Sequence, residues 1–317
     1  MPDLITLGET MVLFSPLSEG PLQYVYHFEK RYAGAESNVA IATARLGRSA
    51  GWISRLGADD FGRYILTSLR GEGVDVSQVR WDPDHPTGVF FRSRGALGGG
   101  SETFYYRHDS AASHLSPEDL DPAYFRDARI LHLTGITPAL SASCRATVYR
   151  AIELARELGL IISFDPNMRL KLWSADEARP VMLDLAARAD VVLPGLAECA
   201  LLWGTEDARA AAEACLRLGA RLVVIKLGTE GAYLCTPESE LRVPAVPVGR
   251  VVDPIGAGDG FAAGLLVGMM EDWPLEQAAR LAVTVGAFAT STPGDIEGYP
   301  DMVRVQAFWA GQAARER

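Results

Sequence analysis

The stretch RILHLTGITPALSASCRATVYRAIELARELGLIISFDPN, residues 129–167, indicates the fold. Short apolar runs stand at its two ends, residues 129–135 and 160–167, and they have the length of buried strands. Between them, apolar side chains recur at helical spacing as far as Leu158. Strands that alternate with helices in this way are typical of a parallel sheet. The stretch therefore predicts two parallel strands joined by a helix.

The same alternation extends through most of the chain. Strands are expected at residues 3–9, 49–57, 190–195, 221–228, 231–235 and 241–246. Helices are expected at residues 36–47 and 59–73, after Trp173, up to Leu218, from about Gly258, over 275–290 and after Pro300. A mostly parallel sheet of this kind is covered by helices on both faces. The predicted fold class is therefore α/β, a three-layer α/β/α sandwich.

Two segments with little helical period, about residues 10–33 and 87–107, interrupt the alternation. The second contains TGVFFRSRG and ETFYYRH on either side of ALGGGS, which is typical of a hairpin with a glycine-rich turn. The sequence shows no internal repeat and no low-complexity linker. We therefore expect a single domain over residues 1–317, in which the two segments form a small β-sheet lid.

The composition restricts the possible partners. The net charge is −10 and the basic residues are scattered singly, which argues against a nucleic-acid surface or an anionic membrane. No apolar stretch reaches membrane-spanning length. No two of the 4 cysteines suggest a metal or redox pair, so free buried thiols are expected. The first residues, MPDLITLGE, do not resemble a secretory signal, and we expect a cytoplasmic protein.

The stretch DPIGAGDGFAAG, residues 253–264, predicts an anion site at the start of a helix. The first N–H groups of a helix lack internal partners and attract anions. Glycine allows a phosphoryl oxygen to approach the backbone, and the same field is expected to hold Asp259 ionised. An ionised carboxylate there can take a proton from an attacking hydroxyl. The alternative interpretation is a simple helix N-terminus with an acid in its first turn.

This stretch resembles the signature of the ribokinase-like (PfkB-type) carbohydrate kinases, roughly D-T-x-G-A-G-D-x-F. Pro254 replaces the usual Thr, and the matching residues are Asp253, Gly256, Ala257, Gly258, Asp259 and Phe261. A second signature is AGAESNVAIATARLG, where Ala33 replaces a glycine and Gly34 is retained. The resemblance covers nearly the whole chain. It implies a ribokinase-like fold, with Asp259 as catalytic base and the backbone of Gly256, Ala257 and Gly258 as the anion hole for a transferring phosphoryl group.

The resemblance also implies ATP, Mg²⁺ and a monovalent cation as cofactors. KLGTEG, residues 226–231, is similar to the family's turn over the nucleotide, although an ordinary β-turn is the alternative. The implied nucleotide-binding residues are Asn167, Lys226, Gly228, Thr229, Gly231, Gly256 and Gly258. The family's N-x-x-E motif has Gly195 in place of Asn and keeps Glu198, which is implied to reach Mg²⁺ through water.

Two arginines suggest the substrate class. Arg107 ends a predicted lid strand, and Arg169 follows a predicted core strand. A carboxylate matches the planar donor fork of arginine, whereas a neutral sugar does not need two guanidinium groups. Together with Tyr105, HLTGITPALS and GDIEG, these arginines resemble the 2-keto-3-deoxygluconate kinase subfamily. That resemblance implies an acid pocket lined by Gly34, Phe90, Tyr105, Arg107, Arg169, Asp259 and Asp295.

We therefore expect ATP-dependent phosphorylation of 2-dehydro-3-deoxy-D-gluconate to its 6-phosphate by a homo-oligomer assembled through the lid. Asn38 is expected either to contact substrate or to cap its helix. The alternatives are a kinase of a neutral sugar such as fructose or ribose, and a sugar-binding regulator without catalysis. The carboxylate and anion-hole glycines disfavour the regulator.

Other motifs have simpler interpretations. Asp60-Phe61-Gly62 spells the protein-kinase DFG, but no other kinase motif accompanies it, and Asp59 and Asp60 fit a helix start. No G-x-x-x-x-G-K-[ST] phosphate loop occurs. The histidines show no zinc spacing, and His132 is expected to be a core histidine with its hydrogen bonds satisfied.

Overall fold

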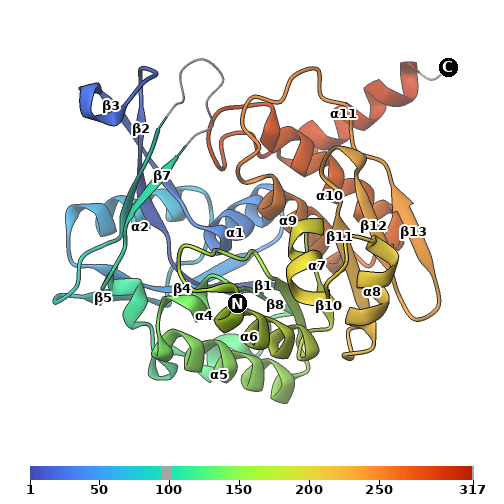
Figure 1. Ribbon diagram of the computed structural model, residues 1–317, viewed down its shortest axis with the longest axis horizontal. Helices are drawn as coiled ribbons and strands as arrows, with labels where there is room; N and C mark the ends of the chain where they lie inside the picture. The colour runs from blue at the N-terminus through green and yellow to red at the C-terminus, as the bar shows by residue number, and fades with distance from the viewer. Residues whose placement is uncertain (94–101, 316–317) are drawn as a thin grey trace.

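The computed structural model describes residues 1–93 and 102–315 and contains a nine-stranded sheet (Figure 1). Its order is β13-β12-β11-β10-β9-β8-β1-β4-β5. The strands are β1 Leu4–Leu7, β4 Ala50–Gly57, β5 Val79–Asp82, β8 Ile130–Thr134, β9 Ile161–Asp165, β10 Val191–Val192, β11 Leu222–Lys226, β12 Ala232–Cys235 and β13 Glu240–Val243. All neighbours are parallel except β11, β12 and β13, which form an antiparallel meander.

The segment that predicted the fold is a βαβ unit. Strands β8 and β9 pair in parallel from Ile130↔Ile161 to Thr134↔Asp165. Helix α5, Ala142–Leu158, joins them after the short helix α4, Thr137–Leu140. Ser141 begins α5 by accepting from the Cys144 N–H, and Gly159 ends it in the left-handed conformation that glycine favours.

Helices cover both faces of the large sheet, as the alternation predicts. Strand β11 shows the division, because Leu222 and Val224 belong to one hydrophobic core and Val223 and Ile225 to the other. The first core contains side chains of α1 Ala35–Arg45, α2 Asp60–Gly71, α9 Ala257–Met270, α10 Leu275–Thr290 and α11 Met302–Arg315. The second contains those of α3 Pro122–Phe125, α5, α6 Ala175–Ala187, α7 Leu196–Trp203 and α8 Ala208–Leu216. The α/β fold class is confirmed.

A second sheet of order β3-β2-β6-β7 stands beside the α/β body (Figure 1). Its strands are β2 Met11–Pro16, β3 Phe28–Ala33, β6 Val89–Arg92 and β7 Thr103–Tyr106. These strands come from the two segments that were predicted to interrupt the alternation of strands and helices. Strands β6 and β7 pair antiparallel, whereas β2 and β6 pair in parallel. The predicted glycine-rich turn ALGGGS, residues 96–101, lies outside the described residues.

Strand β5 was not predicted. It lies at the edge of the large sheet, and only Asp82 of its four residues is buried, so it lacks the apolar pattern of a core strand.

The helix start at Asp59 was predicted correctly: the Asp59 carboxylate accepts from the Gly62 N–H at 2.7 Å, and Asp60 is exposed. All four cysteines are free and buried, as expected. Among the helices described, none combines the length and apolarity that crossing a membrane requires.

Close packing fixes helix α9. A Cβ atom on Gly264 would lie 2.8 Å from the Ala282 Cα, and one on Gly268 would lie 2.5 Å from the Ala278 Cβ. Both alanines belong to α10, so the two helices approach as closely as glycine allows. This packing holds the first turn of α9 at the end of the large sheet where several strands finish.

Candidate active site

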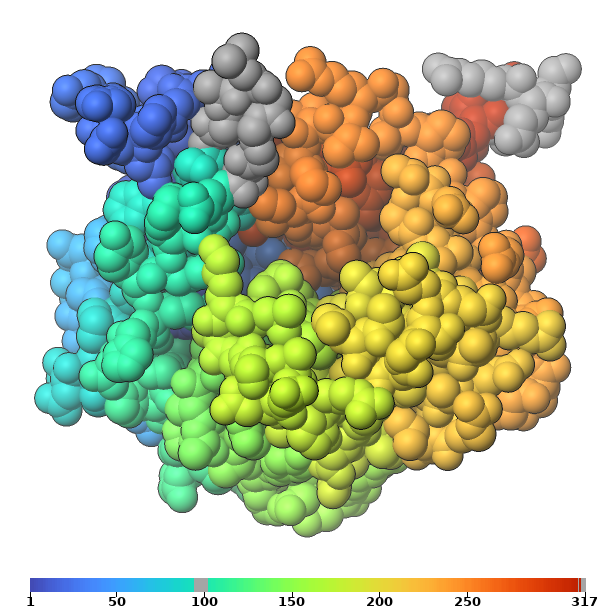
Figure 2. Space-filling model, viewed as in Figure 1, coloured from blue at the N-terminus to red at the C-terminus, as the bar shows by residue number. Residues whose placement is uncertain are grey.

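A cleft of about 1530 Å³ lies between the small sheet and the carboxyl ends of the parallel strands. Figure 2 shows the molecule hollowed at this point. Most of the predicted site residues line it: Gly34, Asn38, Phe90, Tyr105, Arg107, Asn167, Arg169, Glu198, Lys226, Gly256, Gly258, Asp259 and Asp295. Four predicted residues do not line the cleft: Ala257, Gly228, Thr229 and Gly231.

The start of helix α9 forms the floor of the cleft. Gly256 precedes the helix with φ +75°, and a Cβ atom there would lie 2.0 Å from the Asp295 carbonyl oxygen. The Tyr299 hydroxyl donates to the Gly256 carbonyl at 2.7 Å. Ala257 instead packs against the hydrophobic core, and its N–H donates to the Pro254 carbonyl at 3.4 Å. Glycine is therefore required at position 256 by both conformation and space.

Asp259 in the first turn of α9 is held by Asn38. The Asn38 Nδ2 donates to Asp259 Oδ2 at 2.8 Å. Gly34, not Asn38, is the N-cap of α1, so the capping interpretation of Asn38 is wrong. Asn38 itself is buried on α1. The contact ties the starts of two helices that are 221 positions apart in the sequence.

The expectation that the helix field keeps Asp259 fully ionised is wrong. Burial raises the pKa of Asp259 to about 7, with a further upward contribution from Asp165, against the lowering effects of the Asn38 hydrogen bond and Arg169. The loss of solvation therefore outweighs the positive end of the helix. A carboxylate with this pKa exchanges protons near neutral pH.

The small sheet brings Arg107 to the opposite side of the cleft. Arg107 forms an ion pair with Glu9, which lies two residues after strand β1 and for which the sequence indicates no pairing or site role. The Ser110 hydroxyl donates to the other oxygen of Glu9 at 2.5 Å. The Arg107 Nε is buried and has no hydrogen-bond partner among the described residues.

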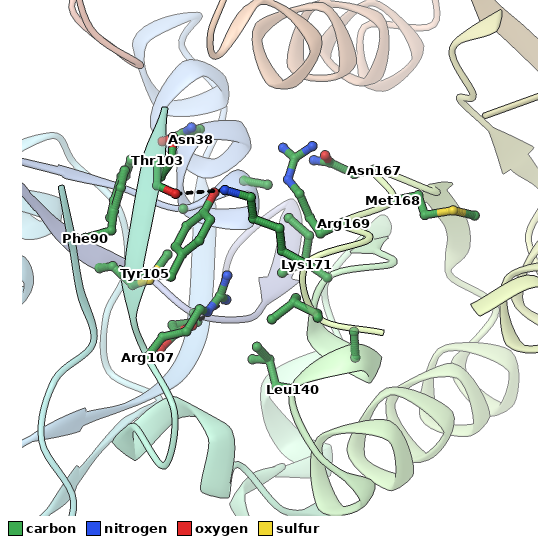
Figure 3. Close-up of a pocket in the computed structure, with 18 of the residues that line it drawn as sticks. Asn38, Phe90, Thr103, Tyr105, Arg107, Leu140, Asn167, Met168, Arg169 and Lys171 are labelled. Atoms are coloured by element: carbon green, nitrogen blue, oxygen red, sulfur yellow. Dashed lines mark hydrogen bonds and ion pairs between the residues drawn. The ribbon is translucent and has the colours of Figure 1, made fainter. Parts of the chain in front are cut away.

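Cationic side chains from the loop after β9 face those of the small sheet (Figure 3). Arg169 is exposed, and in Figure 3 its guanidinium group extends toward Asn167, whereas Lys171 extends toward Tyr105. Lys171 donates to the Thr103 carbonyl of β7 at 2.8 Å, which links the two walls of the cleft. The Tyr105 ring lies 5.5 Å from the Arg107 guanidinium and 5.8 Å from the Lys171 ammonium group.

Asp295 is already paired within the protein. Its carboxylate accepts from Arg92 at 3.1 Å, and the same guanidinium lies 3.7 Å from Asp253. Burial raises the pKa of Asp295 to about 6, although Arg92 opposes the shift. Arg92 was not predicted because it lies in a strand of the small sheet, 203 positions from its partner.

A third ionic cluster lies at the ends of β9 and β11. The Lys226 ammonium group donates to Asp165 at 2.6 Å. Glu198, at the start of α7, accepts from the N–H groups of Gly195 and Met168, each at 2.8 Å. Burial raises the pKa of Glu198, which Lys226 opposes. Lys226 therefore points to the sheet end, not into the turn that follows it.

Two expectations about histidine need correction. His132 is buried and its Nδ1 lies 3.0 Å from the Ser163 hydroxyl, but its Nε2 has no partner among the described residues. Burial lowers the pKa of His132 to about 3, so it is a neutral core residue with one unsatisfied nitrogen. Although the sequence spacing shows no metal motif, the fold brings His85 and His114 together with Asp109.

The sequence matches the model of the pfkB family carbohydrate kinases over residues 1–302. The chain belongs to this family. It is 42% identical to the 2-dehydro-3-deoxygluconokinase of Bacillus subtilis (strain 168), over 98% of this chain and 96% of the relative. It is 38% identical to the 2-dehydro-3-deoxygluconokinase of Thermoproteus tenax, over 95% of this chain and 92% of the relative. The protein is thus a carbohydrate kinase.

Solved structures agree with this assignment to the pfkB family. A PfkB protein from Polaromonas sp. JS666 has a TM-score of 0.89 and 40% identity, and the match covers 97% of this chain and 100% of that one. A protein described as a putative ribokinase II from E. coli, in complex with ATP and Mg²⁺, has a TM-score of 0.91 and 26% identity. The match covers 98% of this chain and 99% of that one. A fructokinase double mutant from Vibrio cholerae O395, with fructose, ADP and potassium bound, has a TM-score of 0.86 and 29% identity over 96% and 98%.

Sequence reasoning missed two residues that this carbohydrate kinase places in the cleft, Arg92 and Lys171. Glu9 was expected at the ligand-binding edge of the sheet, but nothing in the sequence paired it with Arg107. Arg92 and Lys171 contact partners 203 and 68 positions away. Single-sequence patterns do not report such contacts, so these residues emerge only from the fold.

Proposed function

We propose that this carbohydrate kinase transfers the γ-phosphoryl group of ATP to the terminal hydroxyl of 2-dehydro-3-deoxy-D-gluconate, which gives the 6-phosphate and ADP. The main support is a set of cationic side chains: Arg107, Arg169 and Lys171 line the same cleft as Asp259. Acidic side chains line it as well, but Glu9 pairs with Arg107 and Asp165 with Lys226, and a carboxylate substrate would complement the remaining cations, Arg169 and Lys171. The identity to the two 2-dehydro-3-deoxygluconokinases agrees with this choice.

Arg107, which lines the cleft beside Tyr105, is proposed to bind the substrate carboxylate with its guanidinium group. The Glu9 carboxylate neutralises the guanidinium group while the cleft is empty and orients it from the other side. Tyr105, which stacks on Phe90 with ring centroids 5.6 Å apart, forms the wall beside it. Arg169 and Lys171 would approach the same carboxylate from the opposite wall.

Asp259 is proposed to accept the proton of the attacking hydroxyl. A base is most effective when its pKa lies near the working pH, and the pKa of about 7 meets that condition. Asn38 orients the carboxylate by donating to Oδ2. The backbone of Gly256 and Gly258, at the positive end of α9, would stabilise the charge on the transferring phosphoryl group.

The acidic cluster at the sheet end fits the proposed Mg²⁺ requirement. Oxygen ligands are those that Mg²⁺ prefers, and it usually keeps several waters. Asp165 and Glu198 offer carboxylate oxygens beside the cleft, and they would hold the ion through water. When bound, Mg²⁺ would neutralise charge on the ATP phosphates.

The remaining nucleotide residues stay part of the proposal. The turn with Gly228, Thr229 and Gly231 follows Lys226, which lines the cleft, so the nucleotide would extend toward this turn. Asn167 has a positive φ of 36° and also lines the cleft. A monovalent cation is proposed because the related fructokinase structure contains potassium.

The small sheet is proposed to act as a lid and as an oligomer interface. Its outer side exposes aromatic rings, including Phe104 at 39% and Tyr106 at 66%. The Tyr106 ring meets Phe91 edge-to-face at 5.8 Å, and Phe91 stacks on Phe14. A second copy that covered this aromatic face would remove it from water.

A substrate panel tests the proposal. ADP release should be fastest with the keto-deoxy acid and slow with D-fructose and D-ribose. Arg107→Ala should lower kcat/KM for the acid about 30-fold or more, because loss of one partner of a buried charge pair costs about 2–5 kcal/mol. Arg63→Ala is the matched control, since Arg63 is exposed and pairs only with Asp60 among the described residues. Preference for fructose, or full acid turnover by Arg107→Ala, would contradict the proposal.

A further inference from the structure

At the edge of the cleft lies a cluster of three side chains, of which Asp109 and His114 line the cleft, and the proposed kinase reaction gives none of them a role. His85 belongs to the loop between β5 and β6, Asp109 follows β7, and His114 ends a short 3-10 helix, Ala111–His114. One ligand atom from each lies within 4.8 Å of the other two. We propose that His85, Asp109 and His114 bind a divalent transition-metal cation of the Zn²⁺ class at the root of the small sheet.

The geometry suits one shared ion. His114 Nε2 lies 2.6 Å from Asp109 Oδ1, and His85 Nε2 lies 4.0 Å from the same oxygen. The two imidazole rings stack with centroids 3.6 Å apart and an interplanar angle of 18°. Neutral imidazole is the form that binds a metal, and a cation would take the place of the hydrogen bond between His114 and Asp109.

A buried carboxylate orients His85 for this role. The Asp82 carboxylate lies 3.0 Å from His85 Nδ1 through one oxygen and 3.1 Å through the other. Asp82 is only 5% exposed, and it also accepts from the N–H of Asp84 at 2.9 Å. The Nδ1 proton is therefore used by Asp82, which leaves the lone pair on Nε2 toward Asp109. Metal-binding histidines are typically fixed by such a second carboxylate.

The donor set selects the class of cation. Two imidazole nitrogens and one carboxylate oxygen favour Zn²⁺, Ni²⁺ or Cu²⁺, whereas Mg²⁺ and Ca²⁺ prefer oxygen ligands alone. Three protein ligands leave a fourth position for water. The side chains of His85 and His114 are 27% and 37% exposed, so an ion from solution can reach them. The four buried cysteines do not compete for it.

The position of the cluster gives the ion a structural effect. His85 precedes β6 by four residues, and Asp109 follows β7 by three. Asp109 also lies two residues after Arg107 and directly before Ser110, which donates to Glu9. A bound ion would tie together the ends of both strands where they leave the α/β body. It would restrict movement of the small sheet and so lower turnover without touching the reacting groups.

Calorimetric titration of the tag-free full-length protein with ZnCl₂ tests the site directly. We expect one ion per chain, and loss of binding in both His114→Ala and His85→Gln. His27→Gln is the control, because His27 is an exposed histidine directly before strand β3 and outside the cluster. Circular dichroism checks that each variant is folded. Unchanged Zn²⁺ affinity in both cluster variants would overturn the proposal.

A second measurement distinguishes a preorganised metal site from nonspecific binding of the ion by exposed histidines. Asp82→Asn should weaken Zn²⁺ binding about 10–100-fold, the usual effect of losing the carboxylate behind a ligating histidine. Excess Mg²⁺ should not displace the ion. Stoichiometric Zn²⁺ should slow sugar-acid phosphorylation by the wild type and leave the rate of His114→Ala unchanged. Equal affinity in Asp82→Asn, or displacement by Mg²⁺, would contradict a preorganised metal site, and equal inhibition of His114→Ala would contradict the effect on the small sheet.

Discussion

The two ends of the cleft are built differently. At the end formed by the large sheet, Asp259 and Asn38 stand on the first turns of two helices whose backbones are fixed by close packing. At the end formed by the small sheet, Arg107 stands after an edge strand and is held by an ion pair with Glu9. Under the proposed function, the rigid end would set the geometry of proton transfer, and the ionic end would recognise the charge of the substrate. Changes at the two ends should therefore affect different kinetic constants.

The largest effect is expected at the rigid end. Asp259→Asn should lower kcat about 10²–10⁴-fold, because the variant has no base for the hydroxyl proton. KM for the acid should change little, since the cationic groups remain. Steady-state ADP release measures both constants. Asp60→Asn is the control, because Asp60 also lies in the first turn of a helix but is exposed. A wild-type kcat for Asp259→Asn would remove Asp259 from the mechanism.

The next effect belongs to the ionic end. Arg169→Ala should lower kcat/KM for the acid about tenfold, near the low end for a charged hydrogen bond because Arg169 is exposed. Activity with a neutral sugar should not fall. Comparing the acid and D-fructose in one assay gives the ratio. An equal loss with both substrates would show that Arg169 serves the reaction and not recognition of the carboxylate.

Asn38→Ala should move the pH profile. The Asn38 hydrogen bond lowers the pKa of Asp259, so its removal raises the pKa. Since the base must be deprotonated, the acidic limb of the kcat profile should shift to higher pH, by about one unit for a charged hydrogen bond of about 1.5 kcal/mol. Simple structural damage would instead lower kcat at every pH and leave the limb where it was.

The smallest effect concerns stability. The pKa of Asp259 is about 7 in the folded state, above the ordinary value of 3.8 for this carboxyl group. The folded state therefore binds more protons, and this group makes the protein less stable as pH rises from about 4 through 7. Asp259→Asn should remove that dependence and be more stable at pH 8, by on the order of 1 kcal/mol because the group faces the cleft. Thermal melts at pH 5 and pH 8 measure it, and an equal Tm difference at both pH values would contradict the assignment.

The residues at the rigid end of the cleft could be predicted from the sequence more fully than the contacts at the ionic end. Helix starts and strand ends have local signals, such as the glycines around Gly256 and the apolar run before Asp165, and both were placed correctly. The raised pKa of Asp259 was not predicted, because the burial that raises it depends on residues distant in the sequence. The pairing of Arg107 with Glu9 and of Arg92 with Asp295 joins the two sheets. The edge strand β5 was not predicted from the sequence, because three of its four side chains are not buried and it therefore lacks the apolar pattern of a core strand.

The contact between Lys171 and Thr103 has a consequence for the departure of products. It is a single hydrogen bond across the mouth of the cleft, and both residues reach solvent. Water can take over each half of that bond, so breaking it costs only about 1 kcal/mol. Thermal motion therefore breaks this hydrogen bond readily, and a phosphorylated product can leave the cleft without any rearrangement of the α/β body.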